Sequence, residues 1–156
     1  MKVNADQPLS TEAFADATFA PHGKVEIWPQ GKVLRYRIVG PVNLETILAF
    51  AKVNGALLAQ WQPAPPYATL SHWSGSLLTQ PDALAAYAEI MKNARPFIAR
   101  ESANVWVLPA DIEGRRLMLP LWKQMYADAG FPLTVFDNDA EAEQFVSACL
   151  SDTANR

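Results

Sequence analysis

The stretch Tyr67–Tyr87, with the sequence YATLSHWSGSLLTQPDALAAY, decides the predicted fold class. It starts as a short apolar strand, passes through a loop of small residues and enters a helix whose start is indicated by the segment TQPD at 79–82. The same order of strand, loop and helix recurs at Val105–Met125 and Leu133–Leu150. This alternation is typical of an α/β protein, because successive strands that are joined by helices must pair in parallel.

The region before this stretch predicts a hairpin and then a helix. Lys24–Trp28 and Lys32–Val39 have the composition of two strands joined by a tight turn, in which Gly31 can take a positive φ angle. Asn43 is expected to cap the following helix, since its side chain can accept a backbone N–H of the first turn.

Prolines and capping residues set the expected ends of the later helices. We expect the helix after residue 79 to stop by Arg95, because Pro96 lacks a backbone N–H and restricts the residue before it. Pro120 is expected to kink the next helix or to delay its start. Gly130 suits the end of that helix, and the segment NDAE at 138–141 has the spacing of a capping box for the last one.

Together these elements predict one α/β domain over residues 21–150, with a mainly parallel sheet in chain order, an antiparallel N-terminal hairpin and about four helices. Residues 1–20 are expected to form a flexible segment, in which a turn of helix after Ser10 can place an aromatic side chain against the body, and residues 151–156 a tail. Crossovers that all step in one direction would gather the helices on one face of the sheet. We therefore expect a second, partly polar face that carries Arg35, Arg37, Thr69, Trp106 and Thr134.

Composition limits the possible functions. Half of the 156 residues are apolar, which suits one hydrophobic core, and no apolar run reaches the ~20 residues needed to span a bilayer. The net charge is −3 and the basic residues are scattered apart from the pair Arg115 and Arg116, which argues against nucleic acid as a partner. The N-terminus lacks the apolar core of a secretory signal, so a cytoplasmic location is expected.

The sequence offers little for catalysis or cofactor binding. The two histidines, His22 and His72, are far apart in the chain and lack the spacing of a metal site. His72 lies close to Ser74, but no G-x-S-x-G elbow presents that serine as a nucleophile. Glycine-rich phosphate loops are absent, and the single cysteine, Cys149, falls at an apolar helix position. We therefore expect no cofactor, no metal and no enzymatic activity.

The predicted contact surface is the end of the sheet where the strand at Tyr67–Leu70 runs into its loop. In a parallel fold Arg115 and Arg116 come close to this loop, where they could meet a small anion or a carboxylate of a partner. Alternatively, Thr79 only caps its helix, and the two arginines only solvate the start of a helix or pair with Asp111 and Glu113. The candidate partner or ligand surface comprises His72, Trp73, Ser74, Ser76, Thr79, Arg115 and Arg116.

Several short motifs resemble those of one family. The segments GPVN at 40–43, LSHWSG at 70–75 and TVFDNDAEA at 134–142, with the order of strands and helices, are similar to the STAS/SEC14-type domains, relatives of the bacterial anti-sigma-factor antagonists. The resemblance covers about Pro21–Leu150 and implies a sequential parallel sheet, usually without enzymatic activity. In the antagonists a serine within Asp-Ser-Ser-Gly, at the start of the helix after this strand, is phosphorylated to switch partner binding. Thr79 stands at that position here, without the acidic residue and the glycine.

Two functions are therefore expected. The first is a non-catalytic binding or regulatory module of STAS-like type, which acts through contacts with a protein partner or with a second copy of itself. The alternative is a carrier or membrane-surface module, similar to SEC14 domains, that binds a small hydrophobic molecule between Leu84, Tyr87, Leu121 and Met125. The same apolar stripes are also what an ordinary core requires.

Overall fold

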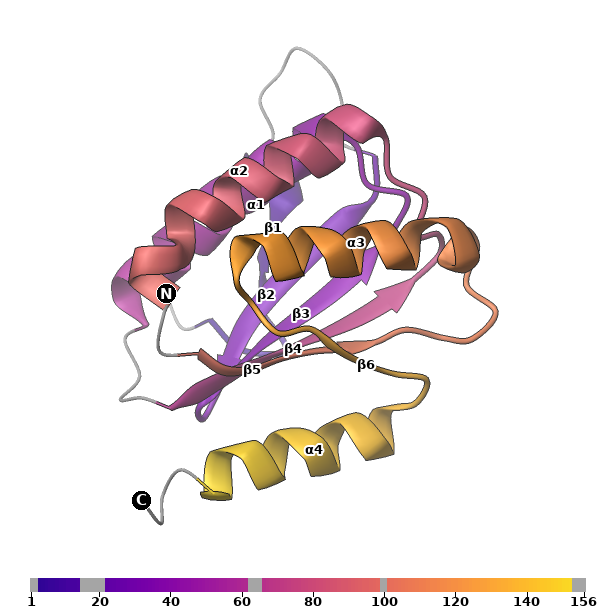
Figure 1. Cartoon of the computed structure of the whole chain (residues 1–156). Coiled ribbons are helices and arrows are strands. Elements are labelled where there is room, and N and C mark those ends of the chain that lie inside the picture. The colour runs from indigo at the N-terminus through magenta and orange to yellow at the C-terminus, as the bar shows by residue number, and fades with distance from the viewer. Residues whose placement is uncertain (1–2, 15–21, 62–65, 99–100, 153–156) are drawn as a thin grey trace.

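The computed structural model describes residues 3–14, 22–61, 66–98 and 101–152, and in these ranges strands and helices form one α/β domain (Figure 1). The elements in chain order are β1 (Leu9–Ser10), the 3-10 helix η1 (Thr11–Phe14), β2 (Lys24–Gln30), β3 (Val33–Val39), α1 (Leu44–Gln60), β4 (Tyr67–Ser74), α2 (Pro81–Ile98), β5 (Glu101–Val107), α3 (Arg115–Ala129), β6 (Thr134–Phe136) and α4 (Asp139–Asp152).

The sheet confirms the predicted fold class. Its strands follow chain order from β1 to β6. β1, β2 and β3 pair antiparallel, whereas β3, β4, β5 and β6 pair in parallel. The hairpin between β2 and β3 turns at Gly31, whose φ angle of 59° lies in the left-handed region, as predicted.

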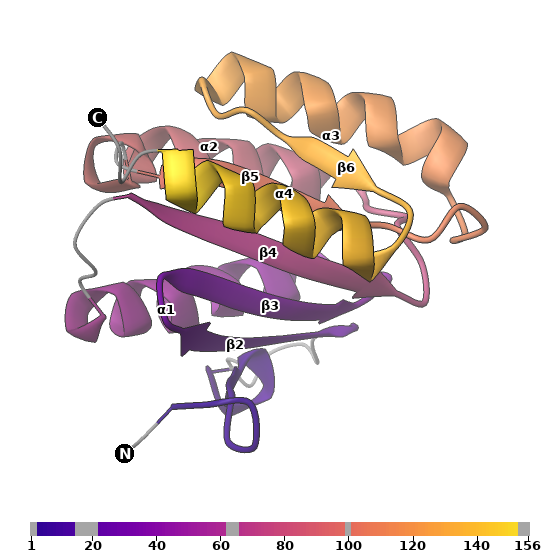
Figure 2. The same ribbon diagram turned by 90° about the horizontal axis from the view of Figure 1, so that it is seen from below.

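Helices lie on both faces of the sheet, which corrects the expectation of a single helix-covered face. α1, α2 and α3 lie on one face and α4 on the other (Figure 1 and Figure 2). On that second face Ala142 and Val146 of α4 pack with Leu70 of β4 and Val105 of β5. The expectation was wrong because the central strands carry apolar side chains on both faces, and each apolar face needs a cover.

Three of the five residues predicted for the polar face lie on the α4 side of the sheet: Arg35, Arg37 and Thr134. The other two face α1, α2 and α3. The Thr69 hydroxyl donates a hydrogen bond to Asn104 Oδ1 at 2.9 Å, and Trp106 is buried in the core under these helices. Side chains alternate along a strand, so an assignment that is off by one residue moves a side chain to the opposite face.

Two polar contacts attach α4 to the sheet. The Arg35 guanidinium binds the Glu143 carboxylate through both terminal nitrogens, at 2.6 and 3.2 Å. Near the start of the helix, His72 Nε2 lies 2.6 Å from Asp139 Oδ1. The helix itself begins as predicted, because Asn138 Oδ1 accepts the backbone N–H of Glu141 at 3.0 Å.

The N-terminal segment contributes more to the domain than expected. β1 pairs with β2, and the fully buried Thr11 accepts the backbone N–H of Val25 through its hydroxyl oxygen at 3.0 Å. η1 is the expected turn of helix after Ser10, and Phe14 at its end packs against the core. The segment 15–20 lies outside the described residues.

Pro96 does not end α2 as predicted, and Pro120 does not delay the start of α3. α2 continues past Pro96 to Ile98, and α3 already begins at Arg115, so that Pro120 stands inside it. A proline in a helix leaves the carbonyl four residues earlier without its N–H partner. Those carbonyls belong to Lys92 and Arg116, both at exposed positions where water can take the place of the missing donor.

Asn43 organises the start of α1. Its Oδ1 accepts the backbone N–H of Thr46 at 3.1 Å and that of His22 at 3.0 Å, so one side chain joins the helix to the segment before β2. We expect Asn43→Ala to lower the free energy of unfolding by about 1–2 kcal/mol, because it leaves two backbone donors without this partner. Urea denaturation monitored by circular dichroism measures the loss.

The matched control is Asn93→Ala, at an exposed position of α2. It should change the free energy of unfolding by no more than about 0.5 kcal/mol. An equal loss in both variants would contradict the capping role of Asn43.

Candidate functional site

A cavity of about 80 Å³ lies between the sheet and the helices α1, α2 and α3. Its sheet side is formed mainly by alternate residues of β3, β4 and β5: Leu34, Tyr36, Ile38, Tyr67, Thr69, Ser71, Trp73, Asn104 and Trp106. Its helix side is formed by Ile47, Phe50, Asn54, Leu58, Tyr87, Met91, Trp122 and Tyr126. For comparison, an apolar protein cavity of roughly 150 Å³ is large enough to bind benzene.

Aromatic rings form much of the wall. The ring of Trp73 lies 5.0 Å from that of Trp106 and 6.0 Å from that of Trp122, measured between centroids. Phe50 continues the wall, with its ring centroid 5.7 Å from that of Tyr87. Large rings in contact have few rotamers and cannot close a gap between them, so the wall is stiff.

Polar groups are set into this apolar wall in hydrogen-bonded pairs. The Tyr36 hydroxyl donates to Asn54 Oδ1 at 2.9 Å, and the hydroxyls of Tyr87 and Tyr126 lie 2.8 Å apart. On the sheet side, the Thr69 hydroxyl donates to Asn104 Oδ1 at 2.9 Å. These pairs place amide and hydroxyl groups where an ordinary core would hold only apolar atoms.

Two indole groups of the wall differ from these pairs. The Nε1–H groups of Trp73 and Trp122 are buried and have no hydrogen-bond partner among the described residues. Both tryptophans line the cavity.

The cavity wall carries no Asp, Glu, Lys, Arg or His among the described residues. The lining residues with a phenol group, which can donate or accept a proton, are Tyr36, Tyr67, Tyr87 and Tyr126. Elsewhere in the described ranges, no group of three or more His, Cys, Asp or Glu side chains is placed to hold a metal ion. The arrangement is suited to enclosing a neutral molecule by shape and hydrogen bonding.

Sequence reasoning missed most of this wall. The signal was present in β4, where the alternate residues Tyr67, Thr69, Ser71 and Trp73 combine aromatic and polar side chains on one face. A face that carries rings at both ends and hydroxyls between them differs from a face packed only with aliphatic residues. Of the four residues predicted to hold a hydrophobic molecule, Tyr87 lines the cavity, whereas Leu121 is exposed.

The predicted contact surface does not form one patch. Trp73 is a core residue, and Ser76 is buried with its hydroxyl oxygen accepting the backbone N–H of Leu78 at 3.1 Å. Ser74 is exposed. Thr79 does not act as the predicted cap, since its hydroxyl donates to the Leu77 carbonyl at 3.0 Å and α2 begins only at Pro81.

The two arginines of that surface have different environments. Arg115 donates to the Leu108 carbonyl at 2.7 Å and to Asp137 Oδ1 at 2.8 Å, so it joins the start of α3 to the loop after β6. Arg115 therefore pairs with a carboxylate, but that carboxylate belongs to Asp137 and not to the expected Asp111 or Glu113. Arg116 is exposed.

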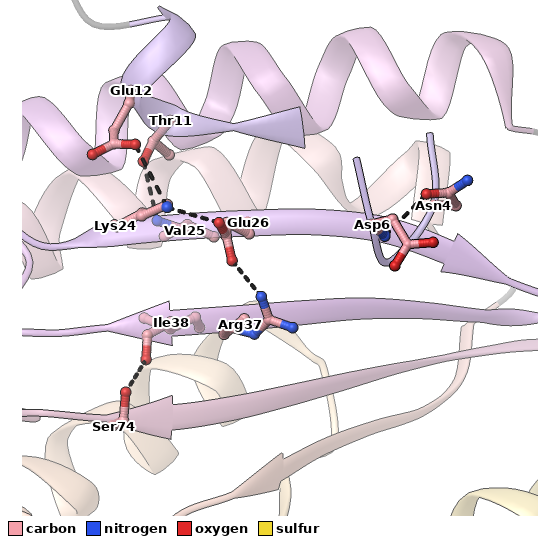
Figure 3. Close-up of polar contacts among 10 residues, drawn as sticks. All are labelled: Asn4, Asp6, Thr11, Glu12, Lys24, Val25, Glu26, Arg37, Ile38 and Ser74. Carbon is pink, nitrogen blue, oxygen red and sulfur yellow. Dashed lines mark hydrogen bonds and ion pairs between the residues drawn. The ribbon is translucent and has the colours of Figure 1, made fainter. Parts of the chain in front are cut away.

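A network of charged side chains lies on β2 and β3, near the edge of the sheet that the N-terminal strands form (Figure 3). Glu26 accepts from Lys24 Nζ and from a terminal nitrogen of Arg37, both at 2.7 Å. The hydrogen bond from Lys24, followed by that from Arg37, lowers the pKa of Glu26, although partial burial opposes this. The same hydrogen bond to Glu26 raises the pKa of Lys24.

Comparisons with known proteins give a likeness in fold. No family model matches the chain, and no curated protein matches it. A solved structure of an ATP citrate lyase mutant from Methanosaeta concilii, in complex with (3S)-citryl-CoA, is similar with a TM-score of 0.53 at 12% sequence identity. The match covers 83% of this chain and 40% of that chain.

Among the described residues, no helix combines the length and the apolar character that crossing a membrane requires.

The lowered pKa of Glu26 makes a pH-dependent contribution to stability. A carboxyl group whose pKa is lower in the folded protein stabilises the fold above its unfolded pKa, and this contribution is lost as the pH falls through the folded pKa. We expect Glu26→Gln to lower the free energy of unfolding at neutral pH. The effect should become progressively smaller as the pH drops below the pKa that the Glu26 carboxyl has in the unfolded chain. Urea denaturation at a series of pH values measures the difference.

Glu89→Gln is the control, because Glu89 is an exposed helix residue whose ion pair with Lys92 lies within α2. Its effect on stability should be smaller at neutral pH. A pH-independent loss in the Glu26 variant would contradict the assignment.

Proposed function

We propose that this chain is a non-catalytic binding domain whose cavity holds a small, mainly apolar, neutral molecule. The observation that carries the proposal is the cavity itself, with polar side chains set among aromatic rings between the sheet and three helices. This is the alternative of the two functions expected from the sequence, and the likeness of the motifs to SEC14-type domains agrees with it.

Packing supports an occupant. Protein interiors are normally filled to the density of organic crystals, so a cavity of about 80 Å³ removes contacts that the core would otherwise make. A bound molecule or ordered water would recover those contacts.

Chemistry supports binding rather than turnover. The lining offers hydroxyls, amides and indoles, none of which is ionised at neutral pH. A molecule in this cavity would be held by burial of its apolar surface and by a few hydrogen bonds. A ligand that binds only the folded domain raises its stability, and through that change the domain could report the presence of the ligand. The domain could also carry the ligand.

The test fills the cavity from the sheet side. Ser71 is buried in β4 and lines the cavity, so Ser71→Leu replaces a small polar side chain with a larger apolar one. We expect this variant to keep the fold, with a free energy of unfolding equal to or up to about 1 kcal/mol above that of the parent. It should lose binding of acetone and isobutene, two four-heavy-atom molecules of the same shape that are smaller than benzene, as measured by saturation-transfer NMR.

Ser74→Leu is the matched control, since it makes the same change at an exposed position of the same strand. It should leave probe binding unchanged. If the parent protein binds neither probe, or if both variants bind as the parent does, the cavity is not a binding site for small neutral molecules.

A second candidate function is contact with a protein partner, which was the first expectation from the sequence. A surface hollow of about 390 Å³ beside Thr79 is lined by Pro41, Leu78 and Leu117, among others. Leu117 is 66% exposed, and Leu121 one turn further along α3 is 48% exposed. Exposed leucines beside a hollow favour an apolar contact there, and we take a second copy of the chain as its occupant.

Light scattering coupled to size exclusion tests this candidate. We expect a dimer that Leu117→Glu converts to a monomer, because the substitution places a charge in the apolar contact. Leu48→Glu, at a similarly exposed leucine of α1 outside the hollow, should leave the dimer intact. A parent protein that is monomeric at high concentration rules out self-association through this surface.

A further inference from the structure

Two polar side chains on the sheet side of the cavity have atoms that a bound molecule can reach. Ser71 of β4 and Asn104 of β5 line the cavity, and each is 6% exposed. Asn104 Oδ1 accepts from the Thr69 hydroxyl, whereas Asn104 Nδ2 and the Ser71 hydroxyl make no hydrogen bond among the described residues. Both atoms keep accessible surface, unlike the fully occluded indole nitrogens of Trp73 and Trp122. Because both residues lie in central strands under the helices, this surface opens into the cavity.

Strand register places these two groups at one step of the sheet. Thr69 pairs with Asn104 across β4 and β5, and Ser71 follows Thr69 by two residues on the same face. The Cα atoms of Ser71 and Asn104 are therefore about 8 Å apart, as the spacing and rise of strands dictate. At that separation one small group can contact the polar atoms of both side chains.

The chemistry of these groups selects a neutral oxygen as their partner. An amide nitrogen can only donate a hydrogen bond, and a serine hydroxyl can donate one as well. An oxygen with two lone pairs, such as that of a ketone or an alcohol, accepts from both groups at once. A buried anion would need a cationic group to offset its loss of hydration, and the lining has no Lys, Arg or His among the described residues.

Beyond Ser71 the wall becomes aromatic. Two residues further along β4 stands Trp73, whose ring centroid lies 5.0 Å from that of Trp106 and 6.0 Å from that of Trp122. Since their nitrogens are closed off or turned to other neighbours, these rings offer the cavity apolar surface, against which hydrocarbon is stabilised by burial. The wall is therefore divided along β4 into a polar part at Ser71 and an apolar part at Trp73.

We propose that Ser71 and Asn104 form a polar subsite that binds a neutral oxygen at one end of the ligand, while the hydrocarbon end lies against the rings of Trp73, Trp106 and Trp122. The ligand class is a small alcohol or ketone with a compact hydrocarbon part. This inference rests on the proposed function and adds to it the orientation of the ligand and two specificity-determining residues, Ser71 and Asn104.

Three probes of the same size and branching test the subsite. Acetone and 2-propanol carry an oxygen where isobutene carries a CH₂ group. Because the probes leave water at different costs, their affinities are compared between parent and variant, where that cost cancels. Ser71→Ala removes one donor and should weaken the binding of acetone and 2-propanol about fivefold relative to isobutene, as the loss of one hydrogen bond allows. Titration of ¹⁵N-labelled protein, followed by NMR, measures the affinities.

Ser76→Ala is the matched control, because Ser76 is also a buried serine but does not line the cavity. The substitution can cost stability, since the Ser76 hydroxyl oxygen accepts the backbone N–H of Leu78. The relative affinities of the three probes should nevertheless equal those of the parent. The same relative fall in both variants would reflect a loosened fold and would overturn the assignment.

The parent protein gives a second readout that needs no variant. In protein with ¹⁵N-labelled asparagine, acetone and 2-propanol should move the Asn104 side-chain amide signals downfield, whereas isobutene should not. These signals are assigned through contacts to Thr69, the hydrogen-bond partner of Asn104. The side-chain amide of Asn93, at an exposed position of α2, should stay in place with every probe.

The remaining outcomes separate the two proposals. If the probes bind but Ser71→Ala changes all three affinities equally, or if isobutene moves the Asn104 signals as acetone does, the cavity binds small molecules and the polar subsite is overturned. If no probe binds the parent protein, the proposed function falls and this inference falls with it.

Discussion

The contact of large aromatic rings between the sheet and the helices is the interaction on which the other features of this structure depend. Trp106 of β5 and Trp122 of α3 have centroids 5.4 Å apart, and Tyr87 of α2 lies 5.2 Å from Trp122. Because these rings pack edge to face, they bury much apolar area and fix the distance between the two layers. The cavity remains because rings of this size do not fill the whole layer between them.

Parallel pairing of the central strands places polar groups at the same level of that layer. Thr69 of β4 is in register with Asn104 of β5, and these two side chains form a hydrogen bond across the strands. Ser71 follows two residues later on the same face. The polar side of the cavity is therefore a product of strand register, and a shift of one residue in β4 would turn these side chains toward α4.

Local signals in the sequence predicted the order of elements and several of their ends. Asn43 caps α1 and Gly130 ends α3 with a φ angle of 79°, because these are properties of a few neighbouring residues. The faces of the sheet were harder to predict. β4 and β5 carry apolar residues on both sides, so the alternation does not say which side receives which helix.

The candidate site was harder still, since it depends on distances between residues that are remote in the sequence. Tyr36 and Asn54 meet across the layer from β3 and α1, and nothing near either residue in the chain indicates the pairing. Trp73 was assigned to a surface loop because small polar residues surround it in the sequence, yet β4 extends to Ser74 and turns the indole inward. Strand length, set by pairing with β3 and β5, decides that position.

The close approach of three indoles also has an optical consequence. Trp73, Trp106 and Trp122 lie within 5.0 to 6.0 Å of one another, measured between ring centroids. Chromophores this close share their electronic transitions, so the trio absorbs as a coupled unit rather than as independent groups. The near-ultraviolet circular dichroism that Trp122 contributes to this unit is therefore a signature of the closed layer, because it is lost when α3 separates from the sheet, whereas Trp73 and Trp106 stay neighbours on β4 and β5.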